Sequence, residues 1–74
     1  MLGALKALRT SIAREEQVPP YIVFSDRTLA ELAVKRPRSL TALGNVRGVG
    51  PMKLERYGQK FLEAISQSNE FEAA

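Results

Sequence analysis

Apolar residues recur three and four positions apart along most of this 74-residue chain, the spacing that places them on one face of a helix. The first such segment runs from Leu2 to about Gln17, with Leu5, Leu8 and Ile12 on the apolar face and basic residues between them. Val18-Pro19-Pro20 ends it, because each proline disfavours helical backbone in the residue before it. The pattern therefore predicts an amphipathic helix followed by an extended connection.

The next four residues, Tyr21-Ile22-Val23-Phe24, are apolar and could form a short strand. No other stretch of the sequence offers this segment a partner, and a lone strand leaves its backbone groups unpaired. We therefore expect an extended or short 3₁₀ segment that lies across the helices, with Ile22 and Phe24 facing inwards. For Tyr21 both a core position and a surface position remain open.

Two serines mark the starts of the next helices, because serine is a good N-cap. Ser25 predicts a helix from Asp26 to about Arg36, which Pro37 ends. Ser39 predicts a short helix from Leu40 to about Gly44. The side chains expected to be buried in this part of the chain are Leu29, Leu32, Ala33, Leu40, Leu43 and Val46.

A glycine turn, Gly48-Val49-Gly50, follows, with Val49 as its expected apolar anchor. Its glycines can adopt the positive φ that other residues avoid, and the proline after them suits the first position of a helix. We predict a fourth helix from Pro51 to about Tyr57 and a last helix from Gln59 to about Asn69, burying Phe61, Leu62 and Ile65. Gly58 either interrupts the helix between these two segments or allows a close contact with another helix.

These elements predict an all-α fold, a compact bundle of five short helices, as a single domain over residues 1–74 with residues 70–74 frayed. The chain has no histidine and no cysteine, so the commonest general base and all thiolate chemistry are missing. No apolar run approaches the roughly 20 residues of a membrane span. We therefore expect a non-catalytic domain that holds no cofactor and no metal and does not enter a membrane.

The charge is distributed unevenly. The net charge is only +3, but the 23 residues from Leu32 to Leu54 contain five basic residues and no acidic one, whereas Glu55 to Ala74 contains two basic and four acidic residues. A basic block beside an acidic end favours a surface that meets a polyanion such as nucleic acid. Ordinary solvated charge is the alternative explanation.

Four basic residues, three in this block and one before it, lack an evident structural role. Arg47 lies in the turn, and Arg38 follows a proline that has already ended a helix. Lys53 and Arg27 lie in first turns of predicted helices, where a cation opposes the helix dipole instead of complementing it. The glycine turn and the start of the helix after it can also present backbone N–H groups to a phosphate.

Other candidates have a structural explanation as well. Lys35 and Arg36 complement the dipole at a helix C-terminus, which accounts for them without a ligand. If Tyr21 is exposed, its ring offers a stacking platform for a base. The predicted nucleic-acid-binding residues are Tyr21, Arg27, Lys35, Arg36, Arg38, Arg47, Gly48, Gly50 and Lys53.

Two segments resemble a known family. Residues 18–29, VPPYIVFSDRTL, are similar to the N-terminal signature of the HRDC domain, the helicase and RNase D C-terminal module. Residues 45–58, NVRGVGPMKLERYG, resemble its C-terminal signature, in the family's order and spacing. Within that family the chain is most similar to the domains of bacterial RecQ DNA helicases.

The resemblance implies an accessory domain of a larger helicase, of which this chain is an excised fragment. ATP and magnesium would then be needed only by the rest of that helicase. It also implies weak binding of single-stranded or branched DNA by a cytoplasmic, nucleoid-associated monomer. In some members an aromatic side chain at the position of Tyr21 contacts single-stranded DNA. A second possibility is a module that docks on other domains of the helicase or on partner proteins, as some HRDC domains do.

Overall fold

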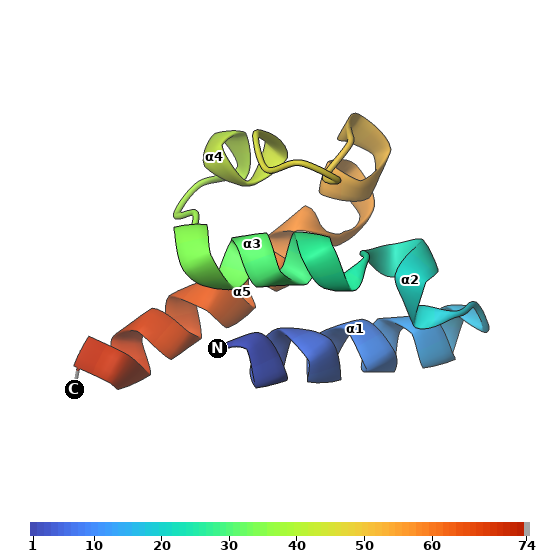
Figure 1. Ribbon diagram of the computed structural model, residues 1–74, viewed down its shortest axis with the longest axis horizontal. Helices are drawn as coiled ribbons and strands as arrows, with labels where there is room; N and C mark the ends of the chain where they lie inside the picture. Colours follow the sequence, from blue (N-terminus) through green and yellow to red (C-terminus); the bar gives the residue numbers. More distant parts are fainter. Residues whose placement is uncertain (74) are drawn as a thin grey trace.

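Five helices make up the described part of the chain, which in this computed structural model is the backbone of residues 1–73 and the side chains of residues 1–67. No strand occurs within those limits, so the prediction of an all-α fold is confirmed. The expected fraying at 70–74 concerns residues outside the described side chains and stays a prediction. The helices are α1 (Leu2–Glu16), α2 (Pro20–Val23), α3 (Asp26–Lys35), α4 (Leu40–Gly44) and α5 (Pro51–Ala73) (Figure 1).

Of the two alternatives predicted for the segment after α1, extended or a short 3₁₀ turn, the structure has a single helical turn and not an extended stretch. Pro19 has the extended backbone that a residue before proline prefers, with φ −61° and ψ 148°. Pro20 then occupies the first position of α2, where its missing N–H costs nothing, and the Ile22 N–H donates to the Pro19 carbonyl at 3.0 Å. The second proline therefore starts this helical turn, and only the extended alternative is wrong.

The predicted break at Gly58 is also absent, since α5 passes through this residue without interruption. Gly58 is buried at the contact between α4 and α5. A Cβ atom at this position would lie 3.0 Å from Leu54 Cδ1 and 3.2 Å from Leu40 Cδ2, closer than side chains normally pack. The close-contact alternative is the correct one, and the two predicted C-terminal helices are one.

Helix ends follow local chemistry. The Ser25 hydroxyl accepts from the Thr28 N–H and the Ser39 hydroxyl from the Ala42 N–H, both at 3.1 Å, so the two predicted N-caps are confirmed. Two of the helices end on a left-handed residue that is not glycine: Gln17 after α1 (φ 58°) and Arg36 after α3 (φ 46°). Each C-cap N–H donates back to carbonyls of the last turn of its helix.

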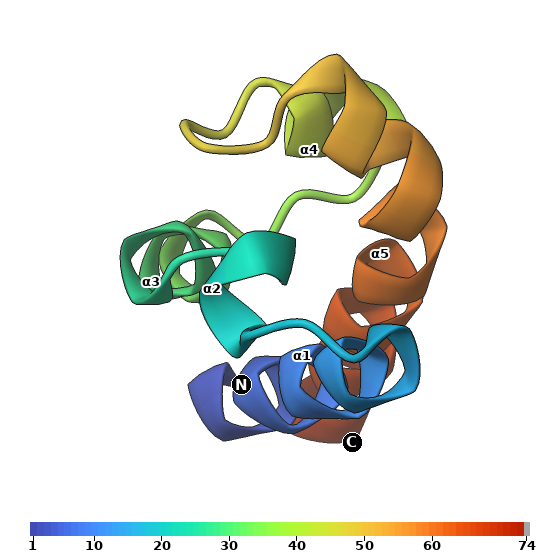
Figure 2. The ribbon, with the colours of Figure 1, turned by 90° about the vertical axis from the view of Figure 1, so that its right-hand side faces the viewer.

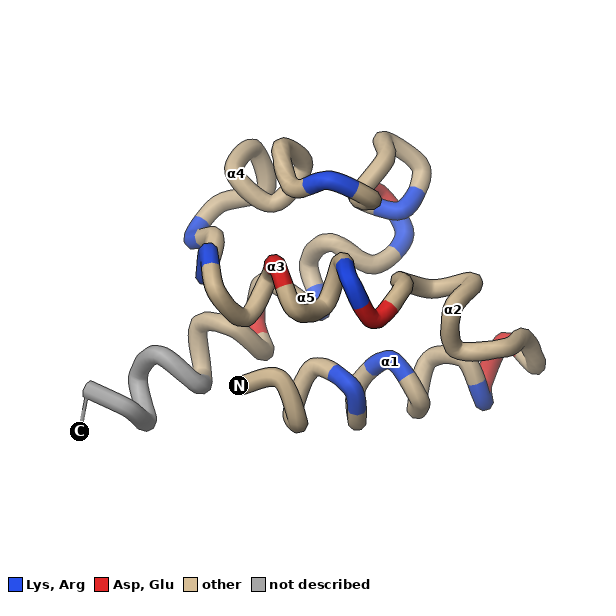
Figure 3. Tube along the Cα trace, in the orientation of Figure 1, with Lys and Arg blue, Asp and Glu red and all other residues tan. Residues whose placement is uncertain are grey.

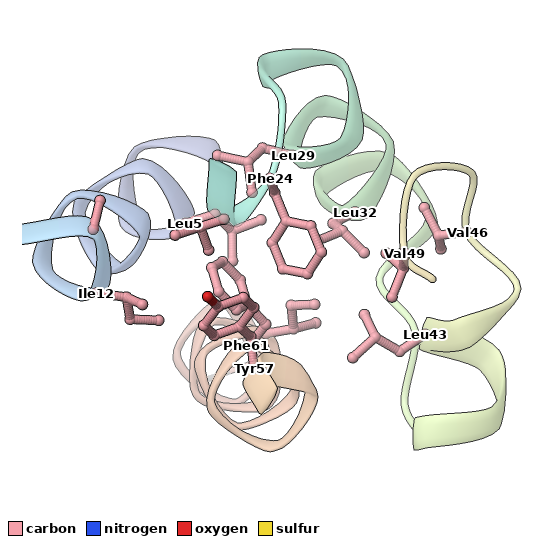
Figure 4. Packing of buried hydrophobic residues seen from close by; sticks show 13 residues of the cluster. Leu5, Ile12, Phe24, Leu29, Leu32, Leu43, Val46, Val49, Tyr57 and Phe61 are labelled. Carbon is pink, nitrogen blue, oxygen red and sulfur yellow. The ribbon is translucent and has the colours of Figure 1, made fainter. Parts of the chain in front are cut away.

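Phe24 lies at the centre of the core, fully buried between α1, α3 and α5 (Figure 4). Its ring meets Phe61 edge-on at a centroid distance of 4.9 Å and Tyr57 at 6.1 Å. Around this aromatic group lie the other buried apolar residues: Leu5, Ile12, Ala13, Val23, Leu29, Leu32, Leu43, Val46, Val49 and Ile65.

Two residues predicted to face inwards do not. Ile22 is 44% exposed, because the helical turn of α2 directs Val23 into the core beside Phe24. Leu40, at the start of α4, is 42% exposed, and only part of its side chain packs against Gly58. Ile22 lies within the helical turn of α2, and Leu40 is the first residue of α4.

The two longest helices are joined by a polar contact at the surface. Glu16 of α1 accepts from the Tyr57 hydroxyl of α5 at 2.7 Å and pairs with Arg56 at 3.3 Å. The Arg56 guanidinium also lies 5.4 Å from the centre of the Tyr57 ring. The hydrogen bond to Glu16, with burial adding to it, raises the pKa of Tyr57 above its usual value. In Figure 2, α1 is seen close to end-on, and α5 descends from beside α4 to lie next to α1.

None of the helices, over the residues searched, is long and apolar enough to cross a membrane.

Candidate nucleic-acid interface

The glycine turn is held against the N-terminal end of α3 by a buried hydroxyl group. Thr28 is 4% exposed, and its Oγ1 donates to the main-chain carbonyl of Arg47 at 3.2 Å. The same hydroxyl lies 3.0 Å from the Ser25 hydroxyl, which caps α3. The start of α3 and the turn between α4 and α5 therefore meet at Thr28, although 19 positions separate it from Arg47.

Only one of the two glycines in the turn has a conformational reason to be glycine. Gly48 has φ +94°, and a Cβ atom there would fall well inside contact distance of Thr28 Oγ1. Gly50 does not have positive φ, and a Cβ atom there would meet nothing within 4 Å. The expectation of a special backbone holds for Gly48 and not for Gly50. Val49 between them is buried, as predicted.

Arg47 and Arg27 extend from the two segments that Thr28 joins. Both side chains are exposed, and within the described part of the chain neither makes a side-chain hydrogen bond or an ion pair. Figure 3 shows basic residues at both ends of α3 and along the turn after α4. The prediction that Arg47 has no structural duty for its side chain is consistent with this placement, and the structure adds that its backbone does have one.

Lys53, in contrast, has a structural role that the sequence did not reveal. It is only partly exposed, and its ammonium group lies 5.8 Å from the centre of the Phe24 ring. A cation over an aromatic face is attracted to it by about 0.5–1 kcal/mol near the surface. The unfavourable position of Lys53 at a helix N-terminus is thus offset by its contact with the core, which weakens the argument that only a ligand explains it.

Arg9 of α1 belongs to the same end of the molecule and was not predicted. Its guanidinium donates to the Phe24 carbonyl at 3.0 Å and pairs with Asp26 at 2.7 Å, with 11% of its side chain exposed. The hydrogen bond from Arg9 and its positive charge hold the pKa of Asp26 below its usual value. Arg9 therefore neutralises the acidic residue that stands next to Arg27 in the chain.

The remaining basic candidates form a separate group at the other end of α3. Lys35 lies 3.7 Å from Glu31, one helical turn back, and Arg36 is the left-handed C-cap residue. Arg38 is exposed and, among the described residues, makes no ion pair. Arg27 and Arg36 are nine positions apart, about 14 Å along the helix axis at 1.5 Å per residue. The predicted site thus consists of two clusters and not one.

Tyr21 is a surface residue. It is 66% exposed on α2, next to the exposed Ile22. The core alternative for Tyr21 is therefore excluded, and its ring is accessible to a planar ligand.

The structure brings together Arg27, Arg47 and Gly48, with Lys53 beside Phe24, around the Ser25–Thr28 cap. It leaves Lys35, Arg36 and Arg38 at the far end of α3.

The sequence did not reveal the roles of Thr28 and Arg9, since neither residue type signals a tertiary contact. Over the residues searched, no group of acidic side chains is arranged to hold a metal ion. Exposed guanidinium groups such as those of Arg27 and Arg47 have the chemistry that suits an anion.

Comparison with known proteins identifies the family to which this small helical domain belongs. The family model of the HRDC domain matches residues 1–65. The chain therefore belongs to the HRDC domain family, as its sequence signatures indicated.

Related proteins agree with this assignment. The chain is 45% identical over 67 residues to the ATP-dependent DNA helicase RecQ of Haemophilus influenzae, covering 90% of this chain and 11% of that protein. It is 44% identical over 61 residues to the RecQ helicase of Bacillus subtilis, covering 82% and 10%. The chain thus spans about a tenth of these relatives. The solved structure of D. radiodurans RecQ HRDC domain 3 has a TM-score of 0.87 and 36% identity, covering 90% of this chain and 88% of that one.

Proposed function

We propose that this domain binds DNA, single-stranded or branched, weakly and without base-sequence specificity, through contacts with the phosphate backbone. The observation that carries the proposal is the pair of exposed arginines, Arg27 and Arg47, on two segments that a hydrogen bond to Thr28 holds together. Neither guanidinium has an acidic partner in the described part of the chain. Arginine binds phosphate through paired N–H groups, so two unpaired guanidinium groups at one end of a domain suit a polyanion.

The expected strength is modest. Three or four phosphate contacts on a single strand give a slope of about −2 to −3 for the logarithm of the association constant against the logarithm of salt concentration. Non-specific complexes of this kind have dissociation constants of about 10⁻⁴ to 10⁻⁶ M at physiological salt. A domain with this affinity would bias a larger protein towards a DNA structure and would not anchor it.

For the larger protein we propose an ATP-dependent DNA helicase of the RecQ type, in which this domain is a non-catalytic accessory that targets or regulates the enzyme. The relatives named above support this proposal. ATP and magnesium would be needed only by the remainder of such a protein. In a bacterial cell the domain would act in the cytoplasm, with the DNA of the nucleoid, and as a monomer.

The experiment is a titration of a fluorescently labelled single-stranded oligonucleotide with the isolated domain, read as fluorescence anisotropy at several salt concentrations. Arg27→Glu combined with Arg47→Glu should weaken binding and reduce the salt slope by about 1.4, the value for two lost contacts. Binding that is absent at low salt, or that does not depend on salt, would overturn the proposal.

The matched control is Arg14→Glu combined with Lys60→Glu. Both residues are exposed, on α1 and α5, and the double change alters the net charge by the same amount. If binding depended only on overall charge, the control would weaken it equally. The proposal requires the control to retain most of the affinity and the full salt slope.

A second candidate function is docking on another domain of the same protein or on a partner protein. The observation in its favour is the adjacent pair of exposed apolar side chains on α2, Tyr21 at 66% and Ile22 at 44%. A photo-crosslinking residue at position 22 of the longer protein would test it. Crosslinks to a defined protein segment, together with no DNA binding by the isolated domain, would favour docking over the phosphate interface.

A further inference from the structure

The buried hydroxyl of Thr28 takes part in an ordered chain of hydrogen bonds whose direction can be derived. A threonine hydroxyl has one proton, and the Arg47 carbonyl can only accept, so the Thr28 proton points to Arg47. The Ser25 hydroxyl must then donate to Thr28 Oγ1, across 3.0 Å. At the same time Ser25 Oγ accepts from the Thr28 N–H. This series of hydrogen bonds therefore runs from the N-cap of α3 through Thr28 to the backbone of the turn.

The turn is fixed at two points on either side of Gly48. On one side the Arg47 carbonyl is held by Thr28. On the other side Val49 is 5% exposed, and its N–H donates to the Val46 carbonyl at 3.1 Å. Because a Cβ atom at position 48 would collide with Thr28 Oγ1, the backbone can approach this hydroxyl only when residue 48 is glycine. The orientation of the peptide group between Arg47 and Gly48 is thus set by α3.

We propose that Thr28 is a positioning residue for nucleic-acid binding, because it fixes the backbone from which the Arg47 side chain leaves. The inference rests on the proposed function and deepens it. Thr28 itself is buried, so its role would be to position Arg47 and not to contact the DNA. Its hydroxyl holds Arg47 at the start of α3, near Arg27, so that both guanidinium groups can meet one phosphate backbone without first ordering the turn. Preorganisation of this kind strengthens binding by reducing the entropy lost on association.

The test uses the isosteric change Thr28→Val, which removes the hydroxyl and retains the side-chain volume, and Thr28→Ser, which retains the hydroxyl. Ser39→Ala is the matched control, since Ser39 caps α4 through the same kind of hydrogen bond and has no contact with the turn among its described hydrogen bonds. Circular dichroism at low temperature first confirms that each variant is folded under the conditions of binding.

The first readout is the salt slope of single-stranded DNA binding, combined with a double-mutant cycle. Thr28→Val should weaken binding about fivefold, within the range of one lost hydrogen bond, and reduce the slope by about 0.7, the value for one phosphate contact. Arg47→Gln should do the same, and the double variant should be little worse than either single one. Thr28→Ser and Ser39→Ala should bind as the wild type does.

The second readout needs no DNA. Trypsin cleaves after arginine, and Arg47 is exposed in a turn. The rate of cleavage after Arg47, compared with cleavage after Arg14 in the same digest, should rise in folded Thr28→Val and remain unchanged in Ser39→Ala. Mass spectrometry of the fragments measures both rates.

The outcomes separate the two proposals. If the wild-type domain binds DNA and folded Thr28→Val binds with the same affinity and slope, the positioning role is overturned and the phosphate interface stands. Full additivity of Thr28→Val and Arg47→Gln also overturns it, because Thr28 would then act independently of Arg47. If the wild-type domain shows no salt-dependent binding, the proposed function fails and the positioning role fails with it.

Discussion

Replacing Gly48 with alanine is the single change that tests the geometry of the turn most severely. Gly48 has φ +94°, a region that costs other residues about 1–2 kcal/mol. The new methyl group would also displace the Thr28 hydroxyl from the Arg47 carbonyl. A buried polar group left without its hydrogen bond costs about 1–3 kcal/mol.

Together these terms predict that Gly48→Ala lowers the free energy of unfolding by about 2–5 kcal/mol. A chain of 74 residues is expected to have a stability of about 4–11 kcal/mol. The change therefore removes a large share of the total and should lower the melting temperature by about 10 °C or more.

Urea denaturation followed by circular dichroism measures this effect, and Gly50→Ala is its matched control. Gly50 lies two residues away, lacks positive φ and has open space where a Cβ would be, so its replacement should change stability by less than about 1 kcal/mol. A Gly48→Ala variant as stable as the wild type, or equal losses from the two changes, would show that the described turn geometry is wrong.

Three further predictions concern the scaffold and use the same urea assay. Asp26→Asn should destabilise the domain at pH 7. The pKa of Asp26 is held below its usual value of 3.8 by Arg9, so this contribution is present above that pH and is lost as the pH falls through the folded pKa. A stability gap between the two proteins that does not narrow as the pH falls below 3.8 would contradict this. Gln17→Gly should raise the free energy of unfolding by about 0.5–1 kcal/mol, because glycine tolerates the left-handed backbone of this C-cap residue. An unchanged stability would argue against a left-handed conformation at position 17. Tyr57→Phe should cost about 1 kcal/mol through the lost bond to Glu16 and leave DNA binding unchanged, so a binding defect would place the interface elsewhere.

Most of the fold could be predicted because local chemistry decides it. The N-caps at Ser25 and Ser39 and the apolar spacing around Leu29 and Leu43 act within a few residues, and the structure agrees with them. The division into helices differed at two places: at Pro20, which occupies the first position of a helical turn, and at Gly58, where longer-range packing decides. At Gly58 the intrinsic cost of glycine in a helix is about 1 kcal/mol, and the contact with α4 outweighs it.

The candidate site could be predicted less completely, since it depends on contacts between distant segments. The unusual character of Gly48 and Arg47 was visible in the sequence. Their attachment to Thr28 could not be predicted, because a threonine in the first turn of a helix gives no sign of a partner 19 residues away. The contact between Lys53 and the ring of Phe24 could not be predicted for the same reason, so the position of Lys53 in the first turn of a helix was interpreted as a sign of a ligand.

The most direct test of the central claim is a map of the residues that DNA touches. The domain, labelled with ¹⁵N, is titrated with an oligodeoxythymidine at low salt and followed by the shifts of its backbone amide signals. We expect the largest shifts at Arg27, Arg47 and Gly48, which diminish when salt is added, and none at Lys60 or Arg14. Shifts confined to α1 or to the middle of α5, with the signals of the turn unmoved, would contradict it.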